Sequence, residues 1–257
     1  MKKQLLTLLL PVLLILSCSK KDEKPSTKID QETLSLNYDQ THQFKLTEGN
    51  TTVDARNVNW TSSDQSVGTI DGSGFFAAKK VGKTTISATA NGSTLKSEVT
   101  VVPYSELCIE PVLDFGASFA AVKAKEKRVI LQQTNTALMY KGENAKVQNV
   151  FYGFETGRLE SSILLLTPSE AVIEESVKFL SERYEFAGES EGLFFFANDQ
   201  VAVGLGVVQE LGFVAVYFDN TQSANRTSQA KSSKEKLGAL KQAFVESSNA
   251  VKLIQTK

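Results

Sequence analysis

Short runs of alternating apolar and polar residues fill the stretch 32–102. Such period-two spacing places successive side chains on opposite faces of a strand. Turn-forming pairs such as Asp71-Gly72 and Asn91-Gly92 separate the runs. This pattern predicts an antiparallel β-sandwich over residues 31–103. Its inward-facing members include Leu34, Leu36, Tyr38, Phe44, Leu46, Val58, Trp60, Ile86, Ala88, Ala90, Val99 and Val101.

Three segments of this stretch resemble the bacterial immunoglobulin-like group 2 family. They are Trp-Thr-Ser-Ser-Asp-Gln-Ser-Val at 60–67, the Ile-Asp-Gly turn at 70–72 and the run from 77 to 86. The resemblance implies that Trp60 fills the core and that the module is a stalk or adhesion-type domain of a bacterial surface protein. Gly68 stands where that family usually has Ala. The resemblance implies no particular ligand.

From residue 104 onward the pattern changes to a helix followed by several strands, twice over. Pro103 ends the last sandwich strand and begins a linker, where we expect limited proteolysis to cut between 103 and 110. The order predicts an α+β domain over 104–257, with helices on one face of an antiparallel sheet. Strands are expected at 128–133, 136–140, 147–156, 160–166, 193–197, 201–209 and 212–218.

Two helices of this domain have clear sequence signals. Ser118 is the expected N-cap of a helix over 118–127. The second helix is expected to start at Thr167, followed by Pro168 and by Glu170 as the other half of a capping box. Its expected buried stripe contains Val172, Ile173, Val177, Leu180 and Tyr184. A polar loop over 221–234 precedes a third, C-terminal helix with apolar residues at Leu237, Leu240, Phe244 and Val251.

The N-terminus carries a short positive segment and then an apolar run from Leu5 to Leu16. A helix of that length spans about 18 Å against roughly 30 Å of hydrocarbon, so the run is too short to cross a bilayer. Residues 1–17 are therefore predicted to be a cleaved signal peptide. A charged, polar tether follows over 18–30.

Ile15-Leu16-Ser17-Cys18 resembles the lipobox of bacterial lipoproteins. The resemblance implies that Cys18 is lipidated and becomes the new N-terminus; three acyl chains would anchor the protein stably. Ser19 implies an outer-membrane destination, and Lys21-Asp22-Glu23 resembles the export signal of surface lipoproteins of the Bacteroidota type. The alternative is an ordinary signal peptide in which Cys18 has no role.

Charge and cysteine content exclude several functions. Cleavage removes Lys2 and Lys3, which takes the formal net charge from −1 to −3. Acidic and basic residues are interspersed, so nucleic acid is not an expected partner. Lipidation of Cys18 leaves Cys108 unpaired, as a small buried residue rather than a nucleophile. One His, His42, and one free Cys do not make a zinc site, so no metal and no cofactor are expected.

Two motifs carry weak catalytic signals. Gly188-Glu189-Ser190-Glu191-Gly192 fits G-x-S-x-G, but a nucleophile elbow needs a strand before it and a helix after it, whereas the opposite order is expected here. The acidic pair Glu174-Glu175 lies on a helix and cannot face itself across a cleft. A hydrolase is therefore disfavoured. Gly204 and Gly206 leave one strand face bare, either for close packing, which we favour, or for a ligand.

Aromatic residues crowd the C-terminal strands. If helices cover only one face of the sheet, some rings lie on the other, and we name Phe194, Phe196 and Tyr217 as binding candidates. The alternative is a second covering layer. The sequence thus predicts a surface-anchored lipoprotein, not an enzyme, that binds an extracellular glycan or protein. The alternative function is a structural, assembly or inhibitor-like partner in the envelope.

Overall fold

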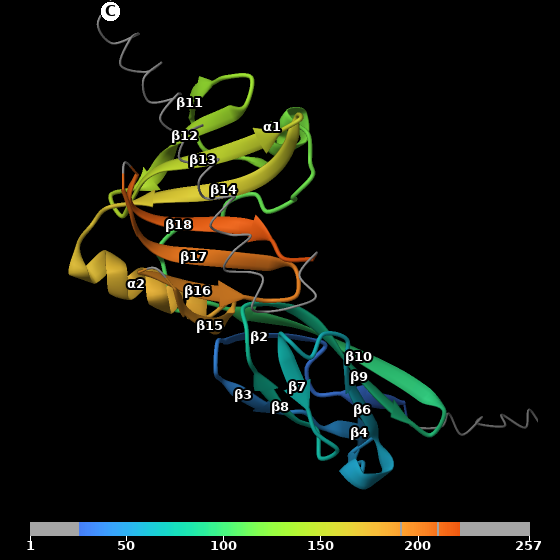
Figure 1. Ribbon diagram of the computed structural model, residues 1–257. Helices are drawn as coiled ribbons and strands as arrows, with labels where there is room; N and C mark the ends of the chain where they lie inside the picture. The colour runs from blue at the N-terminus through green and yellow to red at the C-terminus, as the bar shows by residue number, and fades with distance from the viewer. Residues whose placement is uncertain (1–25, 191, 210, 222–257) are drawn as a thin grey trace, which may run out of the picture.

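The computed structural model describes residues 26–190, 192–209 and 211–221, which form two domains joined end to end (Figure 1). Both domains are built mostly of strands. The signal peptide, Cys18, the predicted loop beyond Thr221 and the predicted C-terminal helix lie outside the described residues. No helix in the described ranges is long and apolar enough to cross a membrane.

The first domain is a sandwich of short strands. One sheet has the order β2 (Thr33–Asn37), β10 (Ser93–Val102), β9 (Gly82–Ala90) and β6 (Asn59–Ser62). A second sheet has the order β3 (Thr41–Gln43), β8 (Phe75–Ala78) and β7 (Gly68–Ile70). A third joins β1 (Thr27–Ile29), β4 (Leu46–Glu48) and β5 (Thr51–Thr52), which a 3-10 turn at Ala55–Asn57 follows. Strand β1 lies inside the range expected for the tether, and Ile29 is part of the core.

Aromatic rings fill the centre of the sandwich, as the resemblance implied for Trp60. The Phe44 ring lies 6.1 Å from Trp60 and 6.3 Å from Phe76, centroid to centroid. Gly74, at φ +83°, turns the chain directly above these rings. A Cβ there would come within 3.0 Å of the Trp60 ring and 2.9 Å of the Phe44 carbonyl oxygen. Only glycine fits this position.

The second domain is one antiparallel sheet of eight strands, with two helices. In spatial order the strands are β11 (Ile130–Gln133), β12 (Ala137–Asn144), β13 (Val147–Glu155), β14 (Arg158–Leu166), β18 (Gly212–Asp219), β17 (Val201–Val208), β16 (Leu193–Ala197) and β15 (Glu185–Ser190). Helix α1 (Phe119–Lys125) precedes the first four strands and α2 (Glu170–Ser181) the last four. The helix-then-strands repeat is present, but the described domain is mostly β. The predicted α+β class overstated its helical part.

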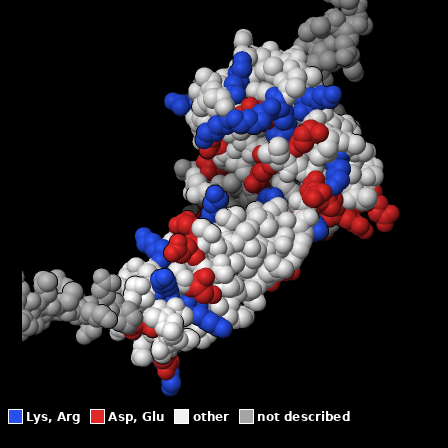
Figure 2. Space-filling model, turned by 180° about the vertical axis from the view of Figure 1, so that it is seen from behind, with Lys and Arg blue, Asp and Glu red and all other residues white. Residues whose placement is uncertain are grey.

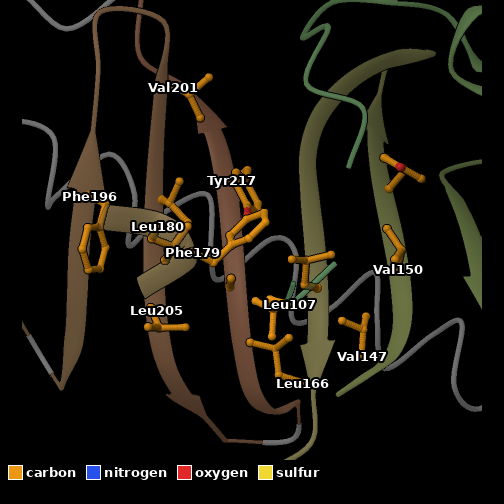
Figure 3. Packing of buried hydrophobic residues seen from close by; sticks show 14 of the residues in the cluster. Leu107, Val147, Val150, Leu166, Phe179, Leu180, Phe196, Val201, Leu205 and Tyr217 are labelled. Carbon is orange, nitrogen blue, oxygen red and sulfur yellow. The ribbon is translucent and has the colours of Figure 1, made fainter. Parts of the chain in front are cut away.

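Two apolar clusters lie on opposite faces of this sheet, because neighbouring residues of each strand alternate between them. The larger cluster contains Tyr217, Leu205 and Phe196 together with Phe179 and Leu180 of α2 (Figure 3). Val122 of α1 also belongs to it. The smaller cluster consists of sheet and turn side chains: Ala137, Phe151, Ile163, Leu193, Val208, Leu211, Val214, Val216 and Phe218.

The sequence predicted the N-cap of α1 correctly but not that of α2. Ser118 caps α1 as predicted, accepting a hydrogen bond from the Ala121 N–H at 3.3 Å. The predicted cap of α2 was wrong: Ser169 caps this helix, while the Thr167 hydroxyl donates to the Ala145 carbonyl. Ser169, two residues later, is the cap instead, because the Thr167 hydroxyl is already bonded to Ala145 in the turn between β12 and β13.

The buried side of α2 also differs in part from the predicted stripe. Phe179 is fully buried, whereas Ile173 is 44% exposed and Val177 40% exposed. Ser176 faces the core in their place, and its hydroxyl donates to the Val172 carbonyl at 2.6 Å. Val172, Leu180 and Tyr184 are buried as predicted. Because a serine whose hydroxyl bonds its own helix can face the core, apolar spacing alone was wrong only for Ile173 and Val177.

Replacing Phe179 by Ala tests which side of α2 carries the domain's stability. Because Phe179 is fully buried, we expect Phe179→Ala to lower the free energy of unfolding by about 3–5 kcal/mol. Ile173→Ala, on the exposed side, should cost less than about 1 kcal/mol. Urea unfolding followed by circular dichroism measures both, and similar losses in the two variants would contradict the assignment.

Candidate functional site

The C-terminal end of α2 is where the two domains meet. Lys80, between β8 and β9 of the first domain, places its ammonium 2.9 Å from the Ser181 carbonyl oxygen and 3.0 Å from that of Tyr184. The Glu185 carboxylate lies 3.1 Å from the same ammonium. Carbonyls at a helix C-terminus have no partners within the helix and attract cations. Lys80 therefore caps a helix of the other domain.

A buried carboxylate, Glu182, fixes the chain that joins the domains. Its side chain is 2% exposed, and its two oxygens accept the N–H groups of Tyr104 at 3.0 Å and Ser105 at 3.1 Å. Its own carbonyl accepts the Val81 N–H of the first domain at 2.8 Å. A buried carboxylate is tolerated only when it is well hydrogen-bonded. Glu182 thus binds the linker and the first domain at once.

Residues 104–116 follow the first domain and are held against the second domain by hydrogen bonds. We call this segment the strap. The Glu175 carboxylate accepts the Ser105 hydroxyl and the Glu106 N–H, both at 2.8 Å. The Glu143 carboxylate accepts the Ile109 N–H at 2.6 Å. These contacts bind the segment that was expected to be a free linker, and its cleavage between 103 and 110 stays a prediction. The sequence showed a proline and polar residues there, but not the carboxylates of distant elements that bind it.

A buried ion network holds the middle of the strap. The Arg128 side chain is 4% exposed and pairs with Glu126 at 2.9 Å and with Glu143 at 2.7 Å. Its guanidinium also donates to the Ile109 carbonyl. The Tyr152 hydroxyl donates to Glu126 and accepts the Val112 N–H. Burial and the Glu126 carboxylate raise the pKa of Tyr152, so it remains a proton donor.

Cys108 is a residue of the strap and carries a half-buried thiol. Burial first, and then the nearby Glu143 carboxylate, raise the pKa of Cys108 to about 12. The thiol is therefore protonated at neutral pH and is a poor nucleophile. Next to it, the partly buried Glu110 accepts the Tyr184 hydroxyl at 2.6 Å, and partial burial raises the pKa of this carboxyl group.

Polar residues of both domains line a cleft of about 730 Å³ at the junction. Charged side chains of both signs gather around this junction between the two domains (Figure 2). Two of the three cations that line the cleft are engaged: Lys80 as above, and Arg183, which donates to the Phe179 carbonyl at 2.9 Å, whereas Lys79 is exposed. The lining residues are Asp64, Gln65, Ser66, Val67, Lys79, Lys80, Val81, Arg183, Glu185, Asn198, Asp199 and Gln200.

Two of the three aromatic binding candidates are core residues. Phe196 is 2% exposed and Tyr217 fully buried, both in the larger cluster, so naming them as contact residues was wrong. Phe194 is 44% exposed on β16. Strand alternation gave the faces correctly, but it could not show how much of each face α2 and the strap cover.

The bare strand face at the two glycines is filled by neighbouring side chains. A Cβ on Gly206 would come within 2.7 Å of the Leu193 side chain, and one on Gly204 within 3.3 Å of the Phe195 ring. Close packing, the favoured interpretation, accounts for both glycines, although the packed neighbours are strand residues and not a helix.

The other residues that were considered for catalysis or metal binding do not come together in the structure. Ser190 ends strand β15, after which Gly192 turns the chain at φ +76°. His42 is in the first domain and bonds Asp30 at 3.2 Å. Glu175 is engaged by the strap. Among the described residues, no three His, Cys, Asp or Glu side chains are close enough to hold a metal ion.

The comparisons with known proteins bear on the first domain. Residues 25–101 match the bacterial Ig-like domain (group 2). This confirms the immunoglobulin-like prediction from the sequence. The match starts before β1, in agreement with a sandwich that begins within the range expected for the tether. No curated protein is significantly similar to the chain.

Two solved structures are distantly similar to the chain. Domains 5–6 of the S-layer protein SbsC are 16% identical, with a TM-score of 0.27, over 77% of this chain and 85% of theirs. Domains 4–9 of SbsC are 17% identical, with the same TM-score of 0.27, over 78% of this chain and 28% of theirs. Likenesses at such TM-scores carry no weight for the function of this protein.

Removal of the Lys80 ammonium should loosen the junction. Lys80→Met keeps most of the side-chain stem but leaves the α2 carbonyls uncapped, at a cost of about 1.5–3 kcal/mol to the interdomain contact. We expect the two domains to tumble more independently, as measured by NMR relaxation. Lys79→Met, at the exposed neighbour, is the control. Unchanged tumbling in Lys80→Met would show that the ammonium does not hold the domains.

Acid should release the strap. Burial acts to raise the pKa of Glu143 and of Glu175, but hydrogen bonds from Arg128 and from Ser105, respectively, outweigh it and hold each pKa below its usual value. A lowered folded-state pKa means that the stabilisation is complete above the unfolded value of about 4.3 and is lost as pH falls through the folded value.

Hydrogen exchange of the Glu106 and Ile109 amides, corrected for intrinsic rates, should therefore show protection that is constant near neutral pH and falls below about pH 4. Amides in β14 serve as the internal control. A Glu143→Gln, Glu175→Gln double variant should weaken this pH dependence. Equal pH dependence in the variant would exclude these two carboxylates as its cause.

Proposed function

We propose that the protein is a lipoprotein of the Bacteroidota type, anchored in the outer membrane through lipid on Cys18, and that it binds a partner at the cell surface without catalysis. In this proposal the immunoglobulin-like domain is a spacer that holds the second domain away from the membrane. The carrying observation is the junction, where Lys80 donates to the Ser181 carbonyl and the Glu182 carbonyl accepts the Val81 N–H across the two domains.

The surface of the second domain favours a protein over a glycan as the partner. Glycan sites use exposed aromatic rings, and two of the three candidate rings are buried. Both outer strands of the sheet carry exposed apolar side chains, such as Phe186 on β15 and Leu131 on β11. Apolar outer strands suit contacts with another polypeptide. An envelope assembly or inhibitor-like partner role would use the same surface.

Replacing Cys18 tests the anchor. Without a thiol to acylate, Cys18→Ala should move from the membrane fraction to the soluble fraction after a carbonate wash. Surface protease treatment of intact cells, read with an antibody to the second domain, tests the orientation. Loss of signal in the wild type is expected. A Cys18→Ala protein that stays with the membrane would overturn the lipid anchor, and a protected second domain would favour envelope assembly.

A further inference from the structure

The two edges of the eight-stranded sheet have different surroundings. The β15 edge faces the first domain, since Glu185 of β15 contacts Lys80. The β11 edge lies at the opposite end of the molecule, farthest from the immunoglobulin-like domain (Figure 1). If the N-terminal side is tethered, the β11 edge is the part that reaches outward.

Exposed apolar side chains mark this outer edge. Val129 is 69% exposed, Ile130 42% and Leu131 51%. No described strand pairs with the outer side of β11. Such an edge presents unpaired backbone groups and is a template for strand addition unless it is protected.

The hydrogen bonds to β12 show which backbone groups face outward. The Lys141 N–H donates to the Val129 carbonyl, and the Thr134 N–H donates to the Ala137 carbonyl. In an antiparallel pair the intervening positions direct their N–H and C=O groups the other way. The pairing of β11 with β12 shifts register between Ile130 and Gln132, so the alternation is counted from each end: Ile130, next to Val129, and Gln133, next to Thr134, present their backbone groups to a strand arriving from outside.

The charge around β11 is positive. Lys123, Lys127 and Lys141 are exposed and make no ion pair within the described ranges. The Lys123 ammonium lies 3.0 Å from the Gln133 side-chain oxygen, at the end of β11 itself. Figure 2 shows Lys and Arg side chains gathered at this end of the second domain.

The positive charge around β11 distinguishes two possible binding partners of this edge, a second copy of the protein and an acidic segment of another protein. Pairing of β11 with β11 of a second copy would bring the lysines of both copies together, and like charges oppose such a dimer. An extended acidic segment would meet complementary charge and could pair with the open backbone groups. We propose that the β11 edge binds an acidic, extended segment of a partner protein as a ninth strand. This inference rests on the proposed binding function and specifies its surface and its partner chemistry.

A synthetic peptide provides the direct test. The probe is a fluorescein-labelled peptide in which valine and threonine alternate with glutamate, and the control peptide has lysine in place of each glutamate. Fluorescence anisotropy should show binding of the glutamate peptide at least about tenfold tighter than that of the lysine peptide. This binding should weaken as salt is added. The Ile130 and Gln133 amides should gain protection from hydrogen exchange in the complex.

Variants locate the site. Leu131→Glu places a negative charge on the exposed edge and should weaken binding of the glutamate peptide by at least about tenfold. Phe186→Glu makes the same kind of change on the β15 edge, where Phe186 is 60% exposed, and should leave binding unchanged. If Leu131→Glu fails to fold, the Lys127→Glu, Lys141→Glu double variant at exposed positions should show the same loss.

Three results of the peptide experiments would overturn this inference: no binding of the glutamate peptide, equal binding of both peptides, or equal loss in Leu131→Glu and Phe186→Glu. Self-association of the wild type in sedimentation that Leu131→Glu abolishes would also overturn it, in favour of a second copy as the occupant. The fractionation and protease experiments on Cys18 and on the second domain are independent of these outcomes. Failure of the β11 site can therefore be told apart from failure of the surface-binding role.

Discussion

A carboxylate that is removed from water must find hydrogen-bond donors, and this constraint organises the molecule. The buried Glu182 follows α2 directly, and the partly exposed Glu175 and Glu143 come from α2 and β12. The donors they find are backbone N–H groups of one continuous segment, the strap. Because the same α2 end also binds Lys80 of the first domain, the segment that would be a hinge is bound along its length. The two domains are thus joined by hydrogen bonds as well as by the chain.

The second domain shows how an unrepeated sequence can give a repeated structure. Each half is a helix followed by four antiparallel strands, and the halves meet where β14 pairs with β18. The repeat places the last strand of each half at the centre and the first strand of each half at an edge. As a result, β11 and β15 are the two outer strands. One of them is beside the first domain, and no strand within the described ranges pairs with the outer side of the other.

Local pattern predicted much of this fold. Alternation located most strands, the Trp60 segment identified the immunoglobulin-like domain, and Ser118 gave the start of α1. These features depend on neighbours in sequence. The sequence did not reveal β15, whose glycines and glutamates resemble a turn, or the true cap of α2, which depends on a contact between Thr167 and Ala145.

The candidate site was less predictable for the same reason. The pattern placed Phe196 and Tyr217 on strands correctly, but their burial depends on α2 and on Leu107 of the strap. Lys80 and Glu182 had no sequence signal at all. A lysine in a loop and a glutamate at a helix end are ordinary surface residues until a second domain is placed against them.

The central position of β18 also has a consequence for the order of folding. Strands β11 to β14 are adjacent in sequence and can pair as soon as they are made, but β14 gains its second neighbour only from residues 212–219. The long segment between β14 and β18 must lose conformational entropy before these two strands gain their contacts, so this pairing forms slowly. Until that late strand arrives, the inner edge of the first half is bare. The sheet is therefore completed from its middle, by the last part of the chain that the structure describes.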